Sequence, residues 1–75
     1  MRVYDEIEPI IKAYKADYPQ LTATITDENI VISDPSSIAG DFVEALAAYC
    51  HANYVGWIVA SVNDIATIII PNKEI

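Results

Sequence analysis

The sequence contains one pattern twice, and this repeat constrains the fold more than any other feature. Tyr4–Pro35 aligns with Gly40–Pro71 at a spacing of 36 residues without a gap. The identical pairs are Asp5 and Asp41, Glu8 and Glu44, Ala16 and Ala52, Tyr18 and Tyr54, Ile32 and Ile68, and Pro35 and Pro71. Each copy has the pattern of a helix followed by a hairpin. One such unit is too small to bury its own apolar face, whereas two can pack together.

The first copy predicts one helix and two strands. Apolar residues recur at helical spacing from about Asp5 to Asp17, and Pro19 ends the helix. Leu21–Thr26 alternates between apolar residues and threonines, which is typical of a half-buried strand. Ile30–Ser33 then returns as its antiparallel partner.

The second copy predicts the same elements with more apolar surface. Asp34-Pro35 supplies a favoured N-cap and first residue for a helix, although the repeat places the regular start at Asp41. Val55–Val62 and Ile65–Ile70 form a hairpin around a two-residue turn, Asn63-Asp64. Both strands are apolar on both faces, and such strands are normally covered on both faces.

These elements predict an α+β fold with a single domain over residues 1–75 and repeat units at about 4–35 and 40–71. We expect a two-layer sandwich in the order α-β-β-α-β-β, with a four-stranded antiparallel sheet, both helices on one face and pseudo-twofold symmetry. The predicted core is Ile7, Ile10, Ile11, Tyr14, Leu21, Ile25, Ile30, Ile32, Phe42, Leu46, Tyr49, Ile58 and Ile68. The element order resembles a shortened roadblock or longin-type domain, whose members dimerise and serve as adaptors, but the third strand and closing helix of that fold are missing.

The apolar content predicts an association surface. Of 75 residues, 53% are apolar, and a chain this short cannot hide so much apolar material in its interior. The two helices can cover one side of the sheet, so a second copy or another protein should cover the other. Apolar atoms also cover much of any protein surface, which is the plain alternative. We select Trp57, Val55, Val59 and Ile69, all on the second hairpin, as partner-binding residues.

The charge indicates which partners the chain can bind. Eleven acids against four bases give a net charge of −7, which disfavours direct binding to nucleic acid and to anionic membranes. A basic protein partner fits this charge. Asp41 and Glu44 share one face of the second helix, and we add them to the partner-binding set.

No catalytic residue, cofactor or metal site is predicted. Cys50 and His51 are neighbours, and neighbours on a helix point about 100° apart, so they do not form a nucleophile and base. A zinc site needs more such ligands, and two glycines, Gly40 and Gly56, make no phosphate loop. A single cysteine cannot form an internal disulfide and no signal peptide is visible, so we expect a cytoplasmic protein.

The sequence therefore favours a small acidic protein-binding module without catalysis, homodimeric, acting stoichiometrically as an inhibitor or adaptor. One alternative is a nucleic-acid mimic that inhibits a basic nucleic-acid-binding protein, since phage anti-restriction and anti-CRISPR proteins are similar in size and acidity. A second alternative is a ligand-binding or enzymatic cleft between two copies.

Overall fold

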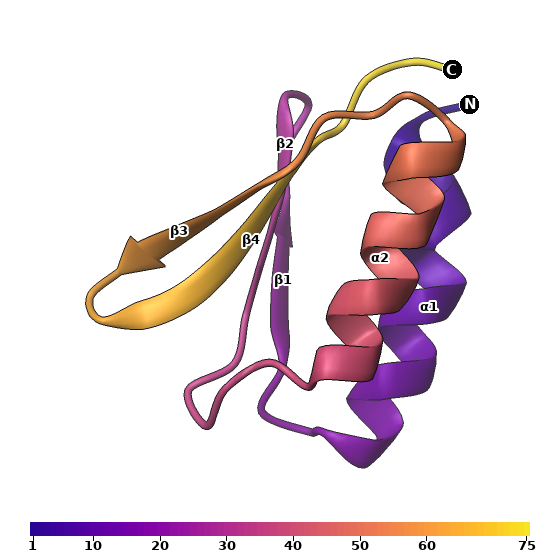
Figure 1. The fold of residues 1–75 in the computed structure, drawn as a ribbon. Coiled ribbons are helices and arrows are strands. Elements are labelled where there is room, and N and C mark those ends of the chain that lie inside the picture. The colour runs from indigo at the N-terminus through magenta and orange to yellow at the C-terminus, as the bar shows by residue number, and fades with distance from the viewer.

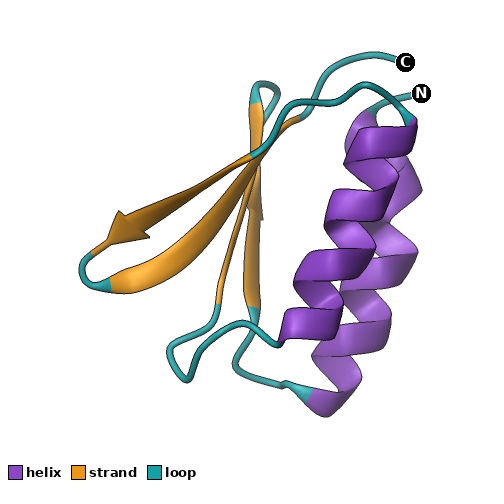
Figure 2. Cartoon of the chain, viewed as in Figure 1, coloured by secondary structure: helices purple, strands orange, loops and turns teal.

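The computed structural model describes all 75 residues and has the two predicted layers (Figure 1). The elements in order are α1 (Val3–Asp17), β1 (Thr22–Ile25), β2 (Asn29–Ser33), α2 (Gly40–Ala52), β3 (Ile58–Val62) and β4 (Ile65–Pro71). The helices lie side by side on one face of a four-stranded antiparallel sheet (Figure 2). The predicted α+β class, element order and antiparallel sheet are confirmed.

The first helix starts two residues before the predicted position, because Asp5 lies within its first turn and caps the backbone N–H of Arg2. The backbone N–H of Arg2 donates to Asp5 Oδ2 at 2.9 Å, so the acid satisfies a donor that a helix start leaves free. At the other end the N–H of Tyr18 donates to the carbonyl of Tyr14 at 2.9 Å, and Pro19 follows.

Asp34 does not cap the second helix, so that expectation was wrong. Its Oδ1 accepts a hydrogen bond from the backbone N–H of Ser36 at 2.8 Å, which closes a local turn instead. Ser37 then has a φ of 124°, a conformation that side chains disfavour and that no helix contains. The chain therefore becomes helical only at Gly40, beside the start that the repeat predicts at Asp41.

The strand pairing follows the 36-residue repeat. The sheet order is β1-β2-β4-β3, so β2 and β4 lie at the centre. Ala23 pairs with Ile32 in the first hairpin, and Val59 pairs with Ile68 at the aligned positions of the second. Ile32 and Ile68, which align with each other, also face each other between β2 and β4. A pseudo-twofold axis thus passes through the centre of the sheet, and β1 and β3 are its two equivalent edges.

The second hairpin closes through the predicted two-residue turn. Asn63 and Asp64 have φ values of 52° and 64°. Two left-handed residues in succession are what a type I′ turn requires, and this turn matches the twist of the strands it joins.

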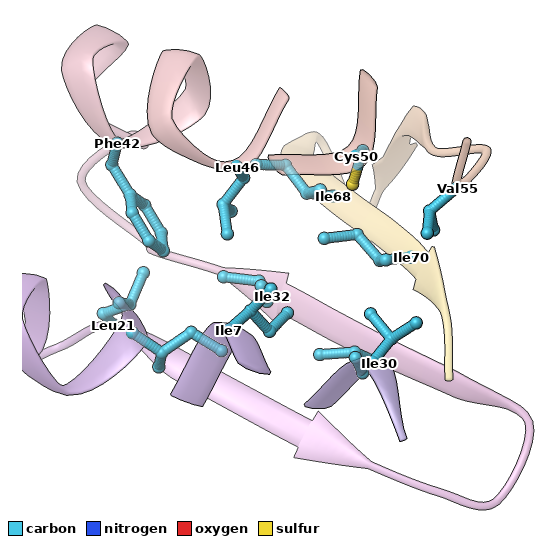
Figure 3. Close-up of a cluster of buried hydrophobic side chains, with 12 residues drawn as sticks. Ile7, Leu21, Ile30, Ile32, Phe42, Leu46, Cys50, Val55, Ile68 and Ile70 are labelled. Atoms are coloured by element: carbon cyan, nitrogen blue, oxygen red, sulfur yellow. The ribbon is translucent and has the colours of Figure 1, made fainter. Parts of the chain in front are cut away.

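The hydrophobic core lies between the helices and the inner face of the sheet (Figure 3). Phe42, Leu46 and Cys50 point from α2 toward isoleucines of β2 and β4 (Figure 3). The buried members are Val3, Ile7, Ile11, Leu21, Ile30, Ile32, Phe42, Leu46, Cys50, Val55, Ile68 and Ile70. Ile10, Tyr14 and Tyr49 pack against this cluster but remain half-buried.

Two predicted core residues are wrong. Ile25 is 39% exposed and Ile58 is 59% exposed. Both lie on edge strands, Ile25 at the end of β1 and Ile58 at the start of β3. Ile58 also pairs with Ile69, on the face of the sheet that the helices do not cover.

Candidate protein-interaction surface

The second hairpin carries most of the exposed apolar surface of the sheet. Ile58, Val59 and Val62 of β3 are 59%, 56% and 48% exposed, respectively. Ile65 and Ile69 of β4 are half-buried beside them. We call these five residues the hairpin surface.

The hairpin surface includes both faces of β3. Val59 pairs with Ile68, which is buried under the helices, so Val59 belongs to the inner face of the sheet. Ile58 and Val62 pair with Ile69 and Ile65 on the outer face. Figure 1 shows the reason: the β3–β4 hairpin turns away from both helices toward its tip, so the helices cannot cover its inner face.

An open apolar depression lies at the base of this hairpin. Its volume is about 380 Å³, and its lining residues are Asn29, Gly56, Trp57, Ile58, Ile69 and Pro71. None of these side chains carries a charge. The depression is therefore suited to an apolar side chain and not to an ionic ligand.

The predicted partner-binding residues fall into three environments. Val55 is only 4% exposed and belongs to the core, so its side chain offers little to a partner in this structure. Trp57 is half-buried against that core and also lines the depression beside Ile69. Val59 lies on the exposed edge strand. Neither Ile58 nor Val62 was selected from the sequence, although both are more exposed than Trp57 or Ile69.

Asp41 and Glu44 lie in the other layer of the molecule. Both are exposed on α2, whereas the hairpin surface lies on the sheet. Burial raises the pKa of Tyr14 on α1, and the neighbouring Asp41 carboxylate raises it further. Both acids lie near Tyr14 of α1 and do not join the apolar residues of the hairpin.

Tyrosine and carboxylate side chains also meet between the helices. The Tyr49 hydroxyl of α2 donates to Glu6 Oε1 of α1 at 3.0 Å. Burial, followed by this hydrogen bond, raises the pKa of Tyr49 to about 12. The tyrosine is thus kept neutral, and the contact stabilises the helical layer.

The hairpin is almost free of charge in a strongly acidic chain. Between Val55 and Pro71 the only ionisable acid or base is Asp64, at the turn. The other ten of the eleven acids lie outside this segment. The hairpin surface is therefore a neutral region on a protein of net charge −7.

Cys50 and His51 do not form a reactive pair in the structure. Cys50 is fully buried and its burial raises the pKa of the thiol, while His51 is exposed. No three His, Cys, Asp or Glu side chains gather closely enough to hold a metal ion. Neither helix has the length and apolarity to cross a membrane.

A second depression, of about 320 Å³, lies between the Asp34 turn and the tip of the hairpin. Asp34 and Asp64 both line it. Asp34 already accepts the Ser36 N–H, and no buried side-chain polar atom in the protein lacks a hydrogen-bond partner. No buried polar atom in this depression therefore lacks a hydrogen-bond partner.

No known family model matches the chain, and no curated protein and no solved structure matches it either. The fold and the exposed hairpin define a small α+β protein with one uncovered apolar surface.

Proposed function

We propose that the protein is a small acidic binding module without catalysis, which associates stoichiometrically with a protein through the hairpin surface. It would act as an inhibitor or adaptor, in a reducing compartment such as the cytoplasm. The observation that carries this proposal is the exposure of Ile58, Val59 and Val62 on one edge strand. Contiguous exposed apolar surface on a small protein is typical of an interaction site.

The hairpin surface can supply useful affinity. Fully burying a valine or isoleucine side chain contributes about 1.5–3 kcal/mol. Ile58, Val59 and Val62 are about half exposed, so covering them would contribute about 1 kcal/mol each. Trp57 and Ile69 offer a partner the adjoining depression, in which an apolar side chain can be held.

The acidic residues contribute to the approach of a partner more than to the contact itself. Asp41 and Glu44 lie on the helical layer, away from the hairpin. A net charge of −7 steers basic proteins toward the molecule at low salt, and screening limits this effect to about 8 Å at physiological ionic strength.

The test replaces the outer face of β3 with the outer face of β1. The triple variant Ile58→Thr, Ala60→Thr, Val62→Thr copies the threonines found at the aligned positions of the first hairpin, so the fold already tolerates this pattern. We expect wild-type protein purified from its source cells to carry a stoichiometric protein, either itself or another chain, and the triple variant to lose it. Native mass spectrometry measures both.

The matched control is Tyr54→Ser, which removes a side chain that is 91% exposed but lies outside the hairpin surface. This variant should keep the partner. A wild-type protein that stays monomeric and retains no stoichiometric protein would contradict the proposal, as would a triple variant that binds as wild type does.

A further inference from the structure

The two edges of the sheet occupy equivalent positions but differ in chemistry. β1 and β3 are related by the 36-residue repeat, and each forms one edge. On the outer face β1 presents threonines, whereas β3 presents apolar residues at the aligned positions. The aligned pairs are Thr22 and Ile58, Thr24 and Ala60, and Thr26 and Val62.

The β3 edge lacks the features that normally prevent an edge strand from pairing with a strand of another molecule. Proteins protect exposed edges with charged side chains, proline, bulges or a covering element. β3 reads Ile-Val-Ala-Ser-Val, with no charge and no proline, and it pairs with β4 residue for residue without a bulge. Every side chain of β3 except the half-buried Ala60 is exposed, on both faces, and the strand lies at the edge of the sheet without a covering helix or loop. Its free edge is a template for another strand.

The charge distribution selects the strand that binds there. A basic partner would find no carboxylate on β3, since Asp64 at the turn is the nearest acid of the hairpin. A second copy of this chain would bring an equally neutral strand, so the contact would oppose no like charges although each molecule carries −7. A neutral, apolar edge in an acidic protein therefore fits its own copy better than it fits a basic protein.

We propose that two copies pair antiparallel through β3 and form one continuous eight-stranded sheet. A twofold axis through Ala60 places Ala60 opposite the partner copy's Ala60. Ile58 then faces the other copy's Val62, and Val59 faces its Ser61. Antiparallel pairing about such an axis keeps both outer faces on one side of the sheet. The small Ala60 side chains at the axis let the strands approach without a clash.

This pairing accounts for an exposure that stacking of two outer faces leaves unexplained. Val59 belongs to the inner face and is 56% exposed. Face-to-face stacking would leave it in water, whereas edge pairing places it against the adjacent strand. Edge pairing also gives hydrogen-bond partners to the outward backbone groups of β3.

The inference rests on the proposed binding function and specifies its partner, and a charge exchange at Ala60 tests it. In the paired sheet two lysines at position 60 would face each other, as would two glutamates. Ala60→Lys and Ala60→Glu should therefore each weaken the dimer by about tenfold or more, measured by sedimentation equilibrium. An equimolar mixture of the two variants places opposite charges together and should restore the dissociation constant to within about threefold of wild type.

The matched controls are Thr24→Lys and Thr24→Glu, at the aligned position of β1. These changes should leave the dimer unaffected. Ala60→Cys supplies a second measurement, because the native Cys50 is fully buried and a short bismaleimide would link only the new thiols. Ala60→Cys should cross-link into dimers and Thr24→Cys should not. Rescue in the mixture cannot arise from misfolded variants.

The outcomes separate the two proposals. A monomeric wild-type protein overturns the self-pairing, and if it still carries another protein through the hairpin surface, the proposed function stands without it. A wild-type dimer that is insensitive to both Ala60 variants overturns the pairing about Ala60. A wild-type protein with no partner of either kind overturns both.

Discussion

At the scale of single residues, Asn72 joins three parts of the chain that are distant in sequence. Its side chain is 4% exposed. Oδ1 accepts the backbone N–H of Tyr4 in α1 at 3.0 Å, and Nδ2 donates to the carbonyl of Thr26 after β1 at 2.9 Å. The Asn72 carbonyl also accepts Arg2 Nη1 at 2.6 Å. Buried polar atoms with such complete pairing are costly to disturb.

Replacing Asn72 should therefore destabilise the fold. Asn72→Ala leaves the Tyr4 donor and the Thr26 acceptor without their partner, and we expect a loss of about 1–3 kcal/mol in the free energy of unfolding. Asn72→Asp keeps one oxygen but sets a carboxylate against the Thr26 carbonyl, so the loss should be larger. Urea unfolding measures both. Asn53→Ala, at the exposed end of α2, is the control and should lose less; equal losses would contradict this role for Asn72.

Tyr49 should make the stability depend on alkaline pH. Its pKa is raised from 10.0 to about 12, so the fold favours the neutral phenol. The stability that this preference contributes is complete below pH 10 and is lost as pH rises toward about 12, because the unfolded chain ionises first. Tyr49→Phe should therefore lose less stability than wild type over that interval. The absorbance of tyrosinate should also show that the last tyrosine to ionise is absent from the variant; an unchanged titration curve would be the contrary result.

At the scale of elements, the sequence predicted correctly the features that residue spacing determines, such as strand faces and turns. Alternation in Leu21–Thr26 assigned the two faces of the first edge strand correctly, and Asn63-Asp64 identified the second turn. Alternation cannot show how far a helix reaches over a strand, so the prediction that Ile25 lies in the core was wrong. The prediction for Ile58 was wrong because β3 is apolar on both faces, and its pattern does not show which face points away from the helices. Asp34 was misread because an aspartate that favours an N-cap equally favours an isolated turn.

The turns of the two hairpins should respond in opposite ways to a glycine substitution. Asp64 has a φ of 64°, where glycine is free of the strain that a side chain causes, so Asp64→Gly should stabilise the protein by about 0.5–1 kcal/mol. Glu28 aligns with Asp64 but does not have a positive φ, so Glu28→Gly should destabilise by a similar amount through added freedom of the unfolded chain. Thermal unfolding distinguishes them, and changes of the same sign would show that backbone conformation is not the cause.

At the scale of the whole molecule, the binding surface was harder to predict than the fold. Apolar excess in a short chain correctly indicated that the second hairpin would carry exposed apolar surface. It did not show which side chains would be exposed: Val55 enters the core, whereas Ile58 and Val62 remain in water. The comparison of Thr22 with Ile58 and of Thr26 with Val62, available once the repeat is seen, was the signal that could have found these two residues.

Salt should distinguish self-association from binding to a basic protein. Two copies of charge −7 repel each other at a distance, and salt shortens that repulsion from about 30 Å at 0.01 M to about 8 Å at 0.15 M. The dimer should therefore tighten as salt rises over this range, as sedimentation equilibrium can measure. Association that weakens with salt would instead indicate attraction to a positively charged protein.

The threonines of β1 affect how large the proposed assembly could become. If two copies pair through β3 as proposed, the β1 strands form the two outer edges of the joined sheet, and their outer face carries threonines. These outer edges would present hydroxyl groups where β3 presents apolar side chains, so adding a third copy would bury less apolar surface than the first pairing.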